Sequence, residues 1–525
     1  MHDDRGLLRA AGTIGAMTAL SRVAGYARDN LQATLLGAAS SSDAFIIAFR
    51  IPNLLRRLLA EGALTSAFVP TFTGYMKQDD RQAMWRFAAS ILYVLTLVLT
   101  ATVVLGELLS PLLVRALAWG FALDPDRMAL TVSLNRWLFP YILLISLAAL
   151  ASGILNAFDV FALPAFTPVL LNLSIITSAV VLAPRIDHPA YAFATGVLVG
   201  GSLQLAIQIP PLLKRGLDLR FPRPFDAAGV REVGRLMLPR VLGAGITQIN
   251  LVVDSQFAST LREGSVSFLY YAIRITELTL GVFAISLSTV ILPRLSRAAI
   301  DRDMRTLVGT LRTALRLLAF ITIPASVGLI MLRLPIVSVL FQRGRFSADD
   351  ALFTSQSLAF YAIGLLPFAA ITVLATVFYA QGDTRTPVIV GGYSFVLHLA
   401  LNFALREPLA HRGIALSTSV SALAGAVALI LVLQRRYAGM LDRDLGLSVA
   451  RTCAAAAIMG GSLHLAIGLF DLEALQGAAA RAAALGGMVA GAGGLFFATA
   501  YLLGSGELRL LAEACGREAG KRCDS

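Results

Sequence analysis

SRVAGYARDNLQATLLGAASSSDAFIIAFRIPNLLRRLLAEGALTSAFVP, residues 21–70, is an apolar stretch of membrane-spanning character that charged residues interrupt. Charges at bilayer depth are costly unless they face a water-filled cavity or a partner. The charged residues here are five arginines and three acids: Arg22, Arg28, Arg50, Arg56, Arg57, Asp29, Asp43 and Glu61. Because guanidinium groups stay charged and grip phosphate oxygens in a fork, the excess of arginine predicts a cationic pocket for a phosphate-bearing ligand.

The composition of the whole chain is that of a polytopic membrane protein. Hydrophobic residues make up 57% of 525 residues, charged residues make up only 14%, and the mean hydropathy is +0.74. An ordinary soluble domain of this length does not combine these values. Asp3 and Asp4 follow Met1, and the first apolar run continues beyond residue 30, so we expect no removable signal peptide and a cytoplasmic N-terminus.

Basic residues cluster in the connections between apolar runs. Arginine and lysine crowd the connections at 214–235, 294–316 and 435–451, whereas 261–267 and 470–477 carry few. By the positive-inside rule, the basic connections are cytoplasmic. The net charge of +12 therefore reflects topology rather than a nucleic-acid-binding face, and we expect no nucleic acid partner.

About fourteen apolar runs are long enough to cross the hydrocarbon core as helices. They lie near 7–35, 42–72, 86–112, 130–156, 161–183, 190–213, 233–258, 266–296, 310–334, 350–380, 386–405, 412–436, 449–470 and 481–504. An even number of crossings returns the C-terminus to the cytoplasmic side. The prediction is an all-α polytopic membrane protein.

A weak internal repeat indicates two similar halves. DAFIIAFRI at 43–51 aligns with SFLYYAIRI at 267–275, an offset of 224 residues, and each copy is the second helix of a six-helix set. We therefore expect two six-helix bundles around a central cationic cavity, plus two C-terminal helices. The predicted domains are an N-terminal bundle at 1–213, a cytoplasmic connection at 214–235, a C-terminal bundle at 236–436, and two further helices with a cytoplasmic tail at 437–525.

Five segments carry a specific resemblance to a known family. They are SRVAGYARD at 21–29, SDAF at 42–45, IPNLLRRLLAEGALTSAFVP at 51–70, FPYILLISLAALASGILNAFDVFALPAFTPVLLN at 139–172 and YYAIRITE at 270–277. These segments resemble the MurJ/MviN family, the lipid II flippases of the multidrug/oligosaccharidyl-lipid/polysaccharide exporter superfamily. The resemblance covers nearly the whole chain and weakens after about residue 440.

The resemblance implies transport of the undecaprenyl-pyrophosphate-linked peptidoglycan precursor, lipid II, from the inner to the outer leaflet of the bacterial cytoplasmic membrane by alternating access. The family's cavity residues fall on Arg22, Arg28, Asp43, Arg56 and Arg274, to which we add Asp29, Arg57 and Glu61 as substrate-binding candidates. Ile273 departs from the family, which often has an acid there, and Glu277 would either hold Arg274 or touch substrate. The expected partners of this monomer are membrane lipids and the cell-wall synthesis machinery.

Several of these charged residues also have structural explanations. Arg22 and Asp29 are seven residues apart, so they lie nearly on one helix face and would pair with each other. Arg57 would alternatively pair with Glu61, four residues later, or snorkel to an interface. Pro52 interrupts the second helix, and the interruption is either a simple kink or the broken helix of a transport site.

A second polar set resembles the sodium site of some family members. It consists of Asp254, His398, Asn402 and Thr418. Asp254, Asn402 and Thr418 offer the oxygen ligands that a hard cation prefers, whereas His398 offers a nitrogen. Sodium is therefore the candidate coupling ion, and no other cofactor is expected. The alternative is that Asp254 is a structural acid bonded to neighbouring helices.

No enzyme motif is present. The chain contains no GxxxxGK[ST], HExxH or GxSxG motif, and its five histidines are scattered. Its three cysteines have neither metal-ligand nor disulfide-framework spacing. The alternatives to a flippase are a multidrug or cation antiporter and a non-transporting scaffold. An arginine-rich pocket would repel cationic drugs, and a scaffold has little reason to bury so many charges.

Overall fold

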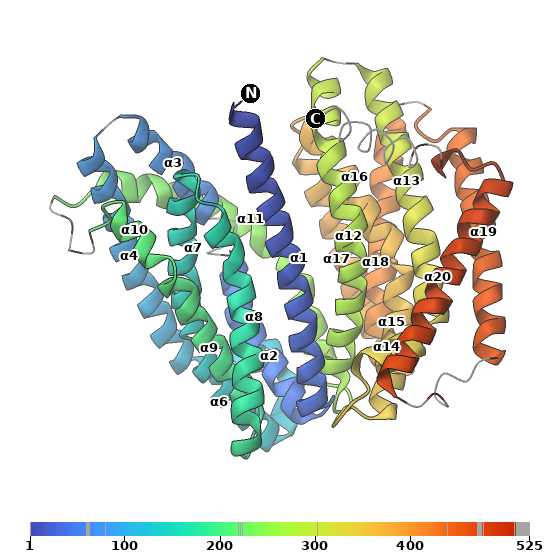
Figure 1. Cartoon of the computed structure of the whole chain (residues 1–525), viewed down its shortest axis with the longest axis horizontal. Helices are drawn as coiled ribbons and strands as arrows, with labels where there is room; N and C mark the ends of the chain where they lie inside the picture. The colour runs from blue at the N-terminus through green and yellow to red at the C-terminus, as the bar shows by residue number, and fades with distance from the viewer. Residues whose placement is uncertain are drawn as a thin grey trace. The chain divides into compact units, whose positions relative to one another are not determined.

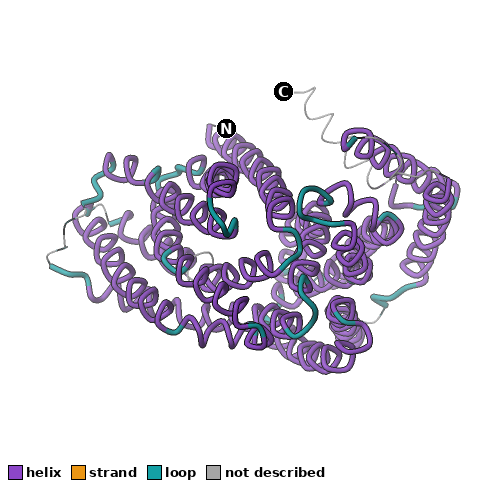
Figure 2. Tube along the Cα trace, turned by 90° about the horizontal axis from the view of Figure 1, so that it is seen from below, coloured by secondary structure: helices purple, strands orange, loops and turns teal. Residues whose placement is uncertain are grey.

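The computed structural model describes residues 2–58, 64–78, 80–218, 220, 222, 224–301, 303–437, 439–469, 475, 477–508 and 510. Within these residues the chain consists of helices and loops, without strands (Figure 2). The predicted all-α fold is confirmed. Contacts divide the chain into two compact units, which are Met1–Ser267 with Arg343–Ser347 (unit 1) and Phe268–Gln342 with Ala348–Ser525 (unit 2).

Unit 1 contains the helices from α1 to α11. They are α1 (His2–Leu36), α2 (Ser40–Arg56), α3 (Thr65–Lys77), α4 (Arg81–Leu108), α5 (Ser110–Leu117), the 3-10 helix η2 (Trp119–Leu123), α6 (Pro125–Leu138), α7 (Tyr141–Ala157), α8 (Ala162–Leu182), the 3-10 helix η3 (Ala183–Arg185), α9 (Ala190–Ala206), α10 (Ile209–Lys214) and α11 (Ala227–Ser259). α8 packs against both α1 and α9 (Figure 1). In one core, the Phe68 ring stacks on Phe72 and Phe87, and all three side chains are fully buried.

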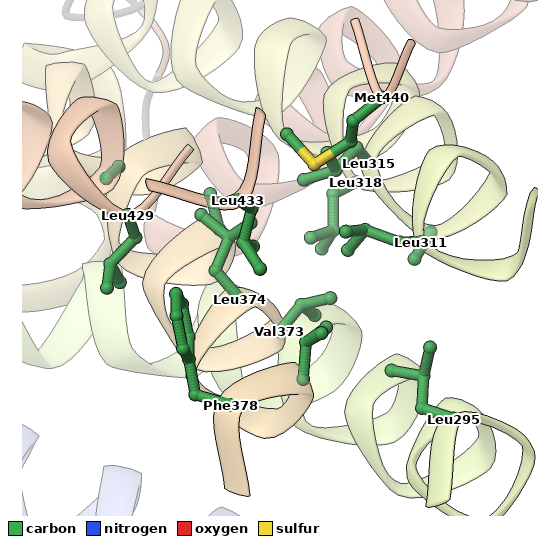
Figure 3. Packing of buried hydrophobic residues seen from close by; sticks show 14 of the residues in the cluster. Leu295, Leu311, Leu315, Leu318, Val373, Leu374, Phe378, Leu429, Leu433 and Met440 are labelled. Atoms are coloured by element: carbon green, nitrogen blue, oxygen red, sulfur yellow. The ribbon is translucent and has the colours of Figure 1, made fainter. Parts of the chain in front are cut away.

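Unit 2 contains the later helices. They are α12 (Ser265–Ile300, whose first residues belong to unit 1), α13 (Met304–Met331), α14 (Arg333–Phe341), α15 (Ala348–Ile363), α16 (Leu365–Ala380), α17 (Arg385–Leu409), α18 (His411–Arg436), α19 (Arg443–Leu469) and α20 (Ala478–Leu502). Leucines of α13 and α18 pack against Val373, Leu374 and Phe378 of α16 in the core of this unit (Figure 3). α19 packs on α13 and α20, so the two helices outside the predicted bundles are integral to unit 2.

Nine helices in the described part of the chain are long and apolar enough to cross a membrane, or ten if the bent pair α15–α16 is one span. A polytopic membrane protein is therefore the correct class. The predicted number of about fourteen crossings stays a prediction. α2, for example, has 17 residues and is too short to be counted alone.

Two of the predicted single spans each consist of two helices. The run 130–156 is divided between α6 and α7 before Tyr141, and the run 350–380 is divided between α15 and α16, with a bend of 40°. Pro140 and Pro367 explain the breaks, because proline has no N–H to donate to the carbonyl four residues earlier. Pro52 acts differently: α2 continues through it, so the predicted interruption there is not a helix break.

α11 packs within unit 1, against α3, α4, α5 and η2. The predicted domains place most of this helix in the C-terminal bundle at 236–436, so the contact division and the predicted limits differ by one helix. The domain boundaries given in the sequence analysis remain predictions. The observed division puts the sequence-predicted site residues of α1, α2 and α11 in one unit.

Candidate functional site

Arg28 in α1 is held by polar side chains on two helices. Its Nε and Nη2 donate to Asp29 Oδ1 at 3.0 and 2.7 Å, and its Nη1 donates to Asn172 Oδ1 of α8 at 3.1 Å. The exposed fraction of the Arg28 side chain is 16%. Asp29 thus pairs with its chain neighbour, and the alternative pairing with Arg22 is not seen. Arg22 is exposed and makes no hydrogen bond or ion pair with any residue that the structure describes.

Asp43 in α2 is fully buried, and hydrogen bonds saturate its carboxylate. Oδ2 accepts from Arg127 Nη2 of α6 and, at 2.9 Å, from the Gly264 N–H. Oδ1 accepts from the N–H and the hydroxyl of Ser267 at 2.8 and 2.6 Å. An ionised carboxylate has about four acceptor sites, and all are used. In this structure Asp43 joins α2, α6 and the beginning of α12, and its side chain has no solvent-exposed surface.

The other arginines at the end of α2 are less buried. Arg56 is half-buried, and its Nε donates to Asn53 Oδ1 at 2.9 Å, one turn earlier in the same helix. Arg57 follows the last residue of α2 and is exposed. Glu61, a substrate-binding candidate and one alternative partner for Arg57, lies outside the described residues.

Arg274 in α12 belongs to unit 2. Its Nη1 donates to Glu277 Oε2 at 2.8 Å, and its guanidinium carbon lies 4.9 Å from the centre of the Tyr270 ring. A third of the Arg274 side chain and half of Glu277 are exposed. An exposed pair of this kind contributes only about 0.2–1 kcal/mol. Glu277 therefore orients Arg274, and an incoming anion could replace Glu277 as the partner of Arg274 at little cost in free energy.

The residues of the candidate sodium site are divided between the units. Asp254 lies in α11 of unit 1, whereas His398, Asn402 and Thr418 lie in α17 and α18 of unit 2. The buried His398 and Asn402 are joined by a 3.1 Å contact between Asn402 Nδ2 and His398 Nε2. Thr418 Oγ1 donates to the Ile414 carbonyl at 3.0 Å. Within the described chain, no three His, Cys, Asp or Glu side chains gather as a metal site.

Sequence reasoning missed three residues that hold the charged groups: Arg127, Asn172 and Ser255. Arg127 is 8% exposed and lies over the Phe121 ring at 4.2 Å. Ser255 of α11 accepts a hydrogen bond from Arg50 Nη1. Each of these three residues could have been noticed in the sequence as a polar residue in or beside an apolar run. The sequence does not show, however, which helix such a residue will contact.

Two residues that the predicted repeat aligns are in contact in unit 1. Asp43 and Ser267 are aligned residues, 224 positions apart, and they are hydrogen-bonded to each other. The first turns of α2 and α12, the two copies of the repeat, are therefore in contact. The alignment of 43–51 with 267–275 predicts equivalent positions and not contact, so this pairing depends on the packing of the helices.

Unit 2 contains an apolar cavity with a volume of about 510 Å³. α13, α14, α19 and α20 form most of its wall, and the residues lining it include Phe320, Pro324, Leu332, Phe496 and Phe497. A cavity with hydrocarbon walls between membrane-spanning helices suits an apolar chain. α19 and α20 thus form part of the wall of this cavity.

Comparison with known proteins identifies close relatives. A family model described as lipid II flippase MurJ matches residues 32–479. The probable lipid II flippase MurJ of Vibrio cholerae serotype O1 is 37% identical over 505 residues, covering 95% of this chain and 96% of that protein. The lipid II flippase MurJ of Burkholderia cenocepacia is 37% identical over 434 residues, covering 82% of this chain and 84% of that protein. Similarity therefore extends through both units.

Solved structures agree with these relatives. The lipid II flippase MurJ in an inward closed conformation matches with a TM-score of 0.76 and 26% identity, covering 95% of this chain and 99% of that chain. An inward-facing multidrug resistance MATE family transporter matches with a TM-score of 0.66 and 16% identity, covering 80% of this chain and 95% of that chain. The second likeness shows a shared fold and nothing about activity.

Proposed function

The chain belongs to the lipid II flippase MurJ family, and from this membership we propose that it moves lipid II from the inner to the outer leaflet of the bacterial cytoplasmic membrane. The observation that carries the proposal is the family match over residues 32–479, which spans both units. The basic connections favour an orientation with both termini in the cytoplasm. We propose that the protein acts as a monomer beside the cell-wall synthesis machinery.

The chemistry of the described residues suits an amphipathic substrate with a pyrophosphate group. Arg28, Arg56 and Arg274 keep part of their side-chain surface accessible. Arg28 is paired with the buried carboxylate of Asp29, and Arg274 is paired with the exposed carboxylate of Glu277. Guanidinium groups of this kind bind phosphate oxygens through two parallel N–H bonds. The apolar cavity of unit 2 offers hydrocarbon walls to a lipid tail. Transport requires no bond to be broken, and we assign no catalytic residue.

Depletion and rescue in a bacterial cell tests this function. We expect Arg28→Ala, Arg56→Ala and Arg274→Ala each to abolish rescue of growth and of lipid II exposure on the outer leaflet while the protein remains inserted and abundant. Lysine at these positions should rescue only in part, because an ammonium group lacks the planar fork. Arg435→Ala is the matched control, since Arg435 is exposed and outside this set. Normal growth with all three alanines combined would overturn the pyrophosphate assignment.

We further propose that sodium is the coupling ion, with Asp254, Asn402 and Thr418 as its oxygen ligands. Carboxylate, amide and hydroxyl oxygens are suitable ligands for a hard cation. Asn402 and Thr418 lie on α17 and α18, which pack against each other. His398 uses its Nε2 for the contact with Asn402, so we assign it the role of orienting that amide.

Asp254→Asn separates ion coupling from a structural role. We expect this variant, in reconstituted vesicles, to bind substrate normally but to flip it slowly and without response to sodium. Asn402→Ala should give the same phenotype more mildly, because it removes a neutral ligand and leaves the carboxylate. Asp126→Asn is a control, since Asp126 is exposed. A wild type without a sodium response, together with normal transport by Asp254→Asn, would contradict the sodium proposal and leave the flippase assignment intact.

A further inference from the structure

A basic pocket lies in unit 1 between the beginning of α4 and the segment that follows α10. Its volume is about 700 Å³. The charged residues that line it are five cations and a single acid: Arg81, Arg86, Lys214, Arg215, Arg220 and Asp218. Trp85, Ala89 and Leu213 contribute apolar surface. None of these residues belongs to the substrate or sodium sets, so this pocket is a separate feature of the molecule.

Neutral backbone groups position two of the cations. Arg81 Nη2 donates to the Arg215 carbonyl at 3.1 Å, and Arg215 Nη1 donates to the Pro211 carbonyl at 3.0 Å. The Arg215 guanidinium also lies 5.8 Å from the centre of the Phe158 ring. Because carbonyls and a ring accept these contacts, the positive charge of both guanidinium groups is not neutralised by them.

The single acid of the pocket, Asp218, does not neutralise the surrounding cations. Asp218 Oδ1 accepts from the Arg220 N–H at 2.9 Å, which is a local turn contact. Within the part of the chain that the structure describes, Asp218, Arg86 and Lys214 form no ion pair. A concave site with this excess of positive charge attracts anions strongly.

The position of the pocket gives it an apolar side. α4 is a candidate membrane span, and its first turns form one wall. The cations therefore lie where a span begins, next to Ala89 and Leu213. Basic pockets at the ends of membrane helices suit phospholipid head groups, since the phosphate meets arginine and lysine while the chains stay in the hydrocarbon.

We propose that this pocket binds the phosphate group of an anionic phospholipid. Arg86 and Lys214 contact the phosphate, Arg81 and Arg215 supply the surrounding positive field, and Ala89 and Leu213 contact the first carbons of the acyl chains. Soluble phosphate compounds share the head-group chemistry but gain nothing from the apolar wall. The inference is independent of the proposed flippase activity, because it uses different residues.

Trp85 provides a reporter within the wall of the pocket. Its ring stacks on Phe158 at 5.8 Å between ring centres, and it is 8% exposed. Gly216, at φ +101°, lies over the indole, and a Cβ there would be 3.2 Å from Trp85 Nε1. Trp85 is therefore held in one place, so a change in its fluorescence reports on the pocket itself.

Native mass spectrometry of the full chain titrated with phosphatidylglycerol tests the proposal. We expect Arg86→Gln/Lys214→Gln to weaken binding by about tenfold or more, because each basic residue near an anionic lipid contributes several-fold. Arg86→Lys/Lys214→Arg keeps both charges and should bind normally. The matched control, Arg435→Gln/Arg443→Gln, removes the same charge from two exposed arginines of unit 2 and should also bind normally. An equal loss in the control, or no loss in the pocket variant, would overturn the proposal.

Fluorescence quenching locates the lipid and distinguishes it from free phosphate. In a Trp119→Phe/Trp137→Phe background, Trp85 is the remaining tryptophan of the three in the chain. We expect brominated phosphatidylglycerol to quench Trp85 more than brominated phosphatidylcholine does, and millimolar inorganic phosphate to leave this difference largely intact. Equal quenching by both lipids would contradict a head-group site. Complete displacement by inorganic phosphate would identify a soluble phosphate as the ligand and overturn the lipid assignment.

Discussion

The charged side chains of α1, α2 and α12 have two different environments. Asp43 is buried and saturated by Arg127, Gly264 and Ser267. Arg28 and Arg274 keep exposed surface while neighbouring side chains orient them. A buried charge stabilises a fold only with its partners in place. Asp43 is therefore expected to matter chiefly for stability, and the two arginines chiefly for binding.

Asp43→Asn should strongly destabilise the protein. The amide would leave the Arg127 guanidinium buried without its counter-charge, and breaking a buried pair in this way costs about 3–5 kcal/mol. Thermal unfolding of the purified protein in detergent measures the loss as a lower Tm. Asp126→Asn, an exposed acid near the start of the same helix as Arg127, should leave Tm unchanged.

Removing both charges is the informative second variant. Asp43→Asn/Arg127→Gln takes away the orphaned guanidinium, so its Tm should recover part of the loss seen in Asp43→Asn. A Tm for Asp43→Asn equal to that of the wild type would show that the pair does not stabilise the fold.

The segment after α20 ties three helices of unit 2 together through Glu507. Its carboxylate accepts from Arg316 Nε of α13 at 2.6 Å, from the Ser448 hydroxyl of α19 at 2.7 Å and from the Ser505 hydroxyl at 2.6 Å. Burial would raise the pKa of Glu507, but the hydrogen bonds to it and the contact with Arg316 lower this pKa to about 2. The ionised carboxylate thus holds α19 and α20 against α13.

The pKa of Glu507 predicts an acid-sensitive element. A carboxyl with a lowered pKa stabilises the folded state fully above its ordinary value of 4.5, and this contribution is lost as pH falls toward about 2. We expect Glu507→Gln to have a Tm several degrees below the wild type at neutral pH. The two proteins should converge as the pH falls below the ordinary value, which Tm measured across a pH series will show.

Glu407→Gln serves as the control for this pH series. The Glu407 side chain is 84% exposed, and its carboxylate lies 3.8 Å from Arg406 Nη2. Its Tm should follow that of the wild type at every pH. A constant Tm difference between Glu507→Gln and the wild type down to the lowest pH would contradict a role for the ionised carboxylate.

The contact between α2 and α12 bears on how the protein opens during transport. Ser42 and Ser265 flank this contact, and both are fully buried. Alternating access requires one end of the cavity to close while the other opens. In the conformation described here, the side chains of Asp43, Ser42 and Ser265 are all buried in unit 1.

Cysteine labelling tests this movement. In a background without the three native cysteines, Ser42→Cys and Ser265→Cys should react slowly with maleimide in membranes that lack substrate. Labelling should change when lipid II accumulates, because substrate shifts the population of conformations. A cysteine at exposed Leu123 is the control for reagent access. Identical labelling in loaded and depleted membranes, with transport running, would argue against opening at this end.

The membrane class, the positions of most spans and the family were predictable from sequence. Hydropathy and charge bias are local properties of a run of about 20 residues, so no tertiary information is needed to recognise a crossing. The motif at 51–70 identified the family in the same way. The prolines at the helix breaks, Pro140 and Pro367, are also visible in the sequence. The presence of a proline does not by itself predict a break, however, because α2 continues through Pro52.

The partners of the charged residues depended on tertiary packing. Arg28 meets Asn172 across 144 residues of chain, and Asp43 meets Arg127 across 84. Such pairings depend on which helices become neighbours, and helical periodicity carries no information about that choice. Burial has the same origin: Asp43 and Arg28 both look like charges in an apolar run, yet packing covers the first and leaves the second partly exposed, because a side chain loses its water only where another helix lies over it.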